Sequence, residues 1–75
     1  MKPYRNLSGR SGVTAYECGD GFIRVRFIHD GIYEYTDARP GRVHVANMQQ
    51  LAEAGRGLAT YISRFVRGNY ARKLD

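Results

Sequence analysis

The stretch that decides the fold is residues 22–36, FIRVRFIHDGIYEYT. In its first half, apolar side chains alternate with Arg24 and Arg26, which is the period-two pattern of a strand with one buried face. After an Asp-Gly turn signal, Tyr33 and Tyr35 lie on one face of a second strand, and aromatic and β-branched residues favour strands. The stretch therefore predicts an antiparallel hairpin.

The register of this hairpin decides what the two tyrosines do, because a slip of one residue exchanges the faces of a strand. A two-residue turn at Asp30-Gly31 pairs Ile28 with Tyr33 and puts both tyrosines on the face of the arginines. That arrangement would be a basic, aromatic surface able to stack single-stranded bases. A three-residue loop, His29-Asp30-Gly31, instead pairs Phe27 with Tyr33 and makes the tyrosines part of the core. We favour the second register, because it groups apolar residues with apolar ones.

Outward from the hairpin, the pattern predicts one more strand before it and two helices after it. The expected elements are strands at 13–17, 22–28 and 32–36, followed by helices at 43–54 and 57–67. Gly55 fits the C-terminal cap of the first helix. In the second helix, Leu58, Ile62, Phe65 and Val66 form an apolar stripe at helical spacing. The predicted fold is α+β, a three-stranded antiparallel β-meander followed by two packed helices.

The length of 75 residues allows one domain with a thin core. We expect a flexible basic arm at residues 1–12, a single domain at 13–70 and a basic tail at 71–75. The single Cys18 cannot form an internal disulfide, and no apolar run approaches the ~20 residues of a membrane span. Residues 1–6 lack the apolar core of a signal peptide, so we expect no secretion signal. The cytoplasm is the expected location, with no membrane partner.

The positive charge is concentrated in one C-terminal segment. Residues 1–55 carry seven Lys/Arg against six Asp/Glu, whereas residues 56–73 carry five basic residues and no acidic one. The basic side chains of this segment are Arg56, Arg64, Arg67, Arg72 and Lys73. Tyr61 and Tyr70 are interleaved with them. A clustered basic segment attracts polyanions, and neighbouring rings can stack on bases.

Two parts of this segment have alternative interpretations. Gly55-Arg56-Gly57 can be a phosphate-binding turn at the start of a helix and a tight connection with a capping glycine, and these two interpretations are compatible. Arg64 and Arg67 lie three residues apart, so they form either a phosphate-contacting ridge or a solvated helix face near the favourable end of the helix dipole. In each case the sequence leaves both interpretations open.

Catalytic and metal-binding patterns are absent from the chain. His29, His44 and Cys18 fall in separate predicted elements and lack the paired spacing of zinc ligands. The acidic residues have no evident partner for acid–base work. We therefore expect a non-catalytic protein with no metal, no cofactor and no evident small-molecule substrate.

Several short motifs follow one another in a recognisable order. A Tyr-x-Tyr motif at 33–35 follows an apolar-x-apolar-x-Phe strand at 23–27 and a turn at Gly31. Ser11 stands shortly before the strand that begins at Val13. In this order the chain resembles the KTSC domain, a small family that occurs alone in bacterial and phage proteins and at the C-terminus of some lysyl-tRNA synthetases.

The second half of the chain resembles this family with departures. Gly55-Arg56-Gly57 stands where the family has Ser-Lys-Gly. Tyr61-Ile62-Ser63 stands where it has Tyr-Phe-Asn, two residues later than expected, with Val66 in place of the following Ile. The resemblance covers roughly residues 11–70. It implies the fold described above and RNA binding, which is the function usually suggested for the family.

Two hypotheses on function follow from the sequence. The first is a nucleic-acid-binding module, with RNA or single strands favoured. The basic residues of segment 56–73 would contact phosphates, Tyr61 or Tyr70 would stack on bases, and Arg24 and Arg26 would add charge from the same side. The second is a protein-interaction module. The exposed edge of the strand at 13–17 would accept a partner strand, and the basic segment would dock on an acidic protein or remain solvated.

Overall fold

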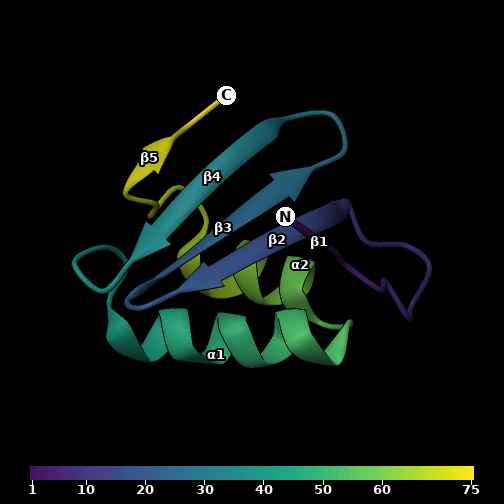
Figure 1. Ribbon diagram of the computed structural model, residues 1–75, viewed down its shortest axis with the longest axis horizontal. Coiled ribbons are helices and arrows are strands. Elements are labelled where there is room, and N and C mark those ends of the chain that lie inside the picture. The colour runs from purple at the N-terminus through teal and green to yellow at the C-terminus, as the bar shows by residue number, and fades with distance from the viewer.

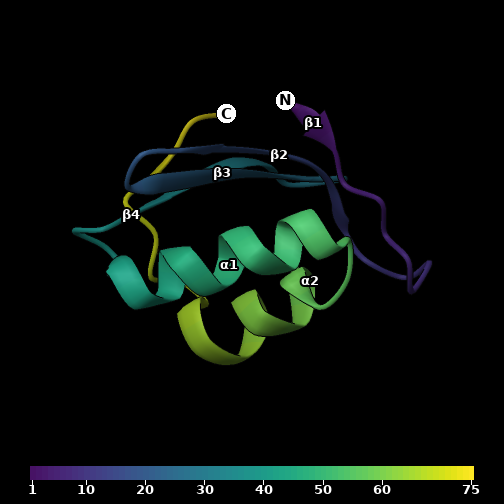
Figure 2. The same ribbon diagram turned by 60° about the horizontal axis from the view of Figure 1, so that its bottom comes forward.

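The computed structural model describes all 75 residues and shows one sheet with helices on one face (Figures 1 and 2). Its elements are β1 (Lys2–Pro3), β2 (Val13–Gly19), β3 (Phe22–Phe27), β4 (Gly31–Thr36), α1 (Arg42–Ala54), α2 (Leu58–Tyr61), the π-helical turn η1 (Ile62–Val66) and β5 (Arg72–Lys73). All strand pairs are antiparallel, in the order β1-β2-β3-β4-β5. No helix has both the length and the apolar character needed to cross a membrane.

The α+β class and the two helices are confirmed, but the expected number of strands is wrong. The predicted meander is present as β2, β3 and β4, and two-residue strands extend it on both sides to a total of five. β1 pairs with β2 at Ala15 and Tyr16, and β5 pairs with β4 at Tyr33 and Glu34. A strand of two residues shows no alternation, so the sequence pattern could not reveal it.

The hairpin register differs from both registers considered above. Val25 lies opposite Tyr33, and Ile23 lies opposite Tyr35. The loop consists of residues 28–30, and Gly31 opens β4 with a φ of 83°. The two-residue turn is therefore wrong. The three-residue alternative assigned the faces correctly, but its pairs are displaced by two residues. Because a displacement of two preserves the faces, the tyrosines still point toward the helices.

The core lies between the helices and the inner face of β2, β3 and β4. Ile23, Met48 and Leu58 are fully buried at its centre. The apolar stripe of the second helix is confirmed except at Phe65, whose side chain is 59% exposed. The π-helical turn η1 changes the angular spacing of its residues, so Val66 remains inside while Phe65 turns outward.

The expectation of an irregular, flexible arm at residues 1–12 is wrong at its beginning. β1 lies in this segment, and Tyr4 is buried in the core with 6% of its surface exposed. The hydroxyl oxygen of Tyr4 accepts a hydrogen bond from the Leu58 backbone N–H at 3.3 Å. The Leu7 N–H donates to the Gly55 carbonyl at 2.7 Å. Tyr4 is an isolated aromatic residue with no apolar neighbour at strand spacing, so the sequence pattern did not predict that it would be buried.

Candidate nucleic-acid interface

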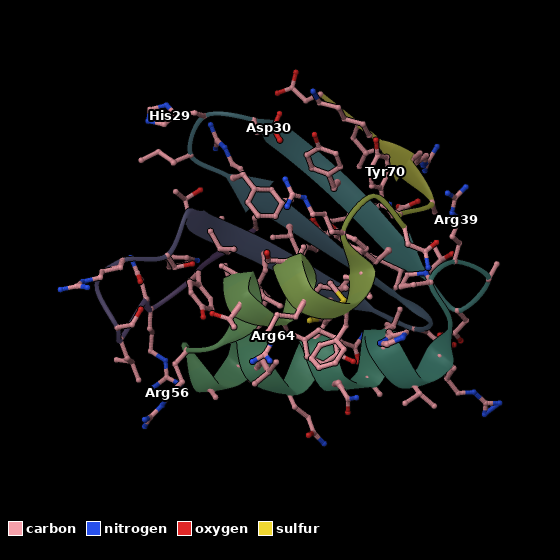
Figure 3. All side chains as sticks on the ribbon, turned by 180° about the vertical axis from the view of Figure 1, so that it is seen from behind. His29, Asp30, Arg39, Arg56, Arg64 and Tyr70 are labelled. Atoms are coloured by element: carbon pink, nitrogen blue, oxygen red, sulfur yellow. The ribbon has the colours of Figure 1, made fainter.

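The nine residues expected to contact nucleic acid lie in three parts of the molecule. Arg24, Arg26 and Arg72 lie on the outer sheet face, Arg56, Tyr61 and Arg64 on the helical layer, and Arg67, Tyr70 and Lys73 where η1 returns to the sheet. Figure 3 shows Arg56 at one end of the helical layer and Tyr70 on the opposite side of the molecule, beside β5. A charge cluster that is continuous in sequence is thus divided in space.

A row of alternating charges crosses the outer face of the sheet from β2 to β5. Arg24 contacts Glu17 at 3.4 Å and Glu34 at 2.8 Å, and Arg72 contacts the other oxygen of Glu34 at 2.9 Å. We call these four residues the charge ladder. Sequence alone did not place Glu34 near Arg72, but β-pairing brings the two residues side by side. Two of the cations expected to bind phosphate therefore already have carboxylate partners.

Glu34 is the centre of this ladder, with a side chain that is only 9% exposed. Hydrogen bonds from Arg72 and Arg24 lower the pKa of its carboxyl group below the usual value of 4.5, although burial opposes them. The pKa of Glu34 is therefore lower in the folded protein than in the unfolded chain. At pH values above the unfolded pKa, the ionised carboxylate stabilises the fold in full. This stability is lost as the pH falls through the folded pKa.

We expect the wild type to lose thermal stability between about pH 5 and about pH 3, and Glu34→Gln to lose less over that range. At neutral pH the variant should be about 1.5–3 kcal/mol less stable, because it removes two charge-assisted hydrogen bonds. Thermal unfolding followed by circular dichroism measures both effects. Glu17→Gln is the matched control, since it removes an exposed carboxylate of the same ladder and should cost less than about 1 kcal/mol. Identical pH profiles for wild type and Glu34→Gln would contradict this role of Glu34.

On the helical layer, Tyr61 joins the two helices. Its hydroxyl lies 2.6 Å from Nδ1 of His44, and the side-chain amide of Asn47 donates to its oxygen at 3.1 Å. The Tyr61 hydroxyl can donate a hydrogen bond to Nδ1 of His44 when that nitrogen carries no proton. The exposed Phe65 ring packs on Tyr61 with centroids 4.8 Å apart. Arg64 precedes Phe65 on the same exposed turn and has no carboxylate within ion-pair distance.

The turn at Gly55-Arg56-Gly57 is a tight connection between helices. Gly55 and Gly57 both have left-handed backbones, with φ of 78° and 81°. The N–H of Leu58, the first residue of α2, is already hydrogen-bonded to Tyr4. The geometry thus corresponds to the capping interpretation. Arg56 remains exposed and without an acidic partner.

Tyr70 and Arg67 border a hollow of about 280 Å³ between the β3–β4 loop and the turn after η1. Phe27 and Tyr33 also line this hollow, which we call the aromatic hollow. Sequence reasoning did not predict it, because it depends on the register of the hairpin and on the return of the chain after η1. Lys73 lies at its margin, 5.5 Å from the centre of the Tyr33 ring and 3.6 Å from Asp30.

The face shared by arginines and tyrosines, which the less favoured two-residue turn would have created, is not formed. Arg24 and Arg26 point to the outer face, whereas Tyr33 and Tyr35 point to the helices. Arg24 instead lies over the ring of Phe22, 4.6 Å from its centre. Neither Tyr33 nor Tyr35 is therefore available to stack on bases at the outer face of the sheet.

No group of three or more His, Cys, Asp and Glu side chains lies close enough to hold a metal ion. Cys18 is exposed on β2, His29 lies in the β3–β4 loop, and His44 faces Tyr61.

By its fold the protein is a small α+β domain, and its basic residues lie in three separate parts of the surface. Comparisons of the chain with protein-family models, curated proteins and solved structures found no match. The resemblance to the KTSC domain therefore stays a prediction that rests on the motifs quoted above.

Proposed function

We propose that this chain is a small, non-catalytic module that binds single-stranded nucleic acid, and RNA in particular, through its C-terminal arginines and aromatic rings. The observation that carries the proposal is that three arginines are exposed and form no ion pair. Arg56, Arg64 and Arg67 are exposed and lack carboxylate partners, so their charge is available to phosphates.

The aromatic neighbours of these arginines support single strands as the ligand. Phe65 is exposed next to Arg64 and is held against Tyr61. An exposed ring beside a guanidinium can stack on an unpaired base, which a duplex does not present. The resemblance to the KTSC family favours RNA over DNA. Arg72 and Lys73 have a smaller part in this proposal than the sequence indicated, because both are paired with acids.

The test is fluorescence anisotropy of a labelled eight-nucleotide single-stranded RNA of mixed sequence at about 50 and about 200 mM salt. The wild type should bind more weakly at the higher salt concentration, since each neutralised phosphate releases counterions. Arg64→Gln/Arg67→Gln should lower the affinity about tenfold and reduce the slope of log affinity against log salt by about 1.4.

Arg26→Gln/Arg42→Gln is the matched control. It removes the same charge from exposed arginines on the outer face and at the start of α1. This control should lower the affinity less than the first pair does. No binding by the wild type at low salt, or binding without salt dependence, would overturn the proposal and leave a protein partner as the leading candidate. An equal loss in both double variants would show that charge acts without a defined site.

A protein-interaction module that uses the edge of β2 has less support than the sequence suggested. β2 is not an edge strand along its whole length, because β1 covers it at Ala15 and Tyr16. On the other side β5 covers β4. Added partner strands require free backbone groups, and both edges of the meander are partly occupied.

A further inference from the structure

The aromatic hollow brings four aromatic rings together, Phe27, Tyr33, Tyr35 and Tyr70. Its rings hold one another in edge-to-face contacts. The centroids of Phe27 and Tyr33 are 5.7 Å apart at 79°, and those of Tyr33 and Tyr70 are 4.7 Å apart at 73°. Such contacts are favourable in themselves and keep the ring orientations fixed. Tyr35 is buried and borders the hollow from the core side.

The turn that follows η1 borders the hollow at Gly68. Gly68 has a φ of 74°, and no atom lies within 4 Å of the position a Cβ would take there. Tyr33 and Tyr70 are only half-buried, so part of each ring borders the hollow and solvent. An open mouth, half-exposed rings and a volume of about 280 Å³ suit a flat ring inserted from outside.

Two arginines without acidic partners lie in or next to the turn that borders the hollow. Arg67 lines it, and the Nε of Arg39 donates a hydrogen bond to the side-chain oxygen of Asn69 at 2.9 Å. Asn69 stands between Gly68 and Tyr70, so this bond ties Arg39 to the turn that borders the hollow. In Figure 3, Arg39 lies on the side of Tyr70 away from Asp30. Neither arginine has a carboxylate within ion-pair distance.

The acid in the lining does not cancel this charge. Asp30 accepts a hydrogen bond from the Tyr33 hydroxyl at 2.9 Å, and its other oxygen lies 3.6 Å from Nζ of Lys73. The hydrogen bond to Asp30 raises the pKa of Tyr33 above its ordinary value. The Asp30 carboxylate thus orients the Tyr33 ring, and Lys73 offsets its negative charge.

We propose that the aromatic hollow binds one unpaired nucleobase of a single strand, with Arg67 and Arg39 contacting the phosphates beside it. The base would stack on the ring of Tyr70 and meet the ring of Tyr33 at its edge, because the two rings are inclined by 73°. This inference rests on the proposed function and deepens it, because it locates the base-binding site and adds Arg39 to the phosphate contacts.

The experiment compares two eight-unit single strands, a mixed-sequence RNA and a strand of abasic tetrahydrofuran spacers with the same number of phosphates. Tyr70→Leu should lower the affinity for the RNA about 5- to 100-fold, the cost of one lost stacking contact. Its affinity for the abasic strand should stay within twofold of the wild-type value. An equal effect of Tyr70→Leu on both strands would overturn the base-binding hollow.

A second pair of variants tests the rim without altering the core. Arg39→Gln should reduce the salt slope for both strands by about 0.7, one phosphate contact on a single strand. Arg42→Gln removes the exposed arginine that begins α1, three residues after Arg39, and should leave the slope unchanged. If Arg39→Gln behaves like this control, Arg39 is not a phosphate contact.

These outcomes separate the inference from the proposed function. A wild type that binds neither strand refutes the proposed function itself. A wild type that binds the RNA, but loses no affinity on Tyr70→Leu, retains the proposed function and refutes the hollow. Thermal unfolding of Tyr70→Leu and Arg39→Gln confirms that each binding measurement is made on folded protein.

Discussion

Tyr4→Ala should lower the free energy of unfolding by about 3–5 kcal/mol, the usual cost of removing a large ring from a core. The stability of a domain of this size is only about 4–11 kcal/mol, so the loss would be a large part of the total. Tyr4 comes from the segment that the sequence assigned to a flexible arm, yet it is buried and hydrogen-bonded to the start of α2.

Urea unfolding followed by circular dichroism measures this effect. Tyr4→Phe removes only the hydroxyl that accepts the Leu58 N–H, so it should cost about 1 kcal/mol. Leu7→Ala is the control within the same segment, because the Leu7 side chain is 56% exposed and should contribute little. A loss below about 1 kcal/mol for Tyr4→Ala would mean that the arm is detached in solution.

Gly55→Ala is expected to destabilise the fold by about 3 kcal/mol through two separate effects. The left-handed backbone at φ 78° disfavours any residue with a Cβ. In addition, the new Cβ would lie 2.8 Å from Cβ of Arg5, which is closer than two carbons can approach. This part of the arm would have to move, although it is fixed by the hydrogen bond of Leu7 to Gly55.

Gly68→Ala separates these two effects. Gly68 has nearly the same backbone, with φ 74°, but its Cβ would meet nothing within 4 Å. It should therefore show only the backbone cost of about 1–2 kcal/mol. The difference between the two variants in chemical denaturation measures the contact with the arm. Equal losses would indicate that the arm yields without cost at Arg5.

The sequence predicted those parts of the fold in which one face of an element is buried. Alternation in β3 and the apolar stripes of the two helices have a clear period, so the inner faces and the helix positions followed from it. The register within the hairpin did not follow, because a displacement of two residues keeps every side chain on its own face. The short strands β1 and β5 have no period at all.

For the candidate site, the sequence predicted which residue types it contains but not how they are arranged in space. Segment 56–73 is rich in arginine and tyrosine, and the structure leaves Arg56, Arg64 and Arg67 without acidic partners. Sequence neighbours could not show that Glu34 and Asp30 approach Arg72 and Lys73, since these pairs form across the sheet. Arg39 was missed because it lies thirty residues before its partner Asn69.

The two short outer strands also determine how this protein could misassemble. Each one shields a longer strand with few backbone hydrogen bonds, so its local opening requires far less free energy than global unfolding. Amides in these strands should exchange with solvent much faster than those of β3. Whenever one of them frays, the β2 or β4 edge becomes available to another copy, and domain swapping or edge-to-edge aggregation can begin. β1 and β5 thus protect the edges of the sheet, and deleting either strand should speed association through the exposed edge.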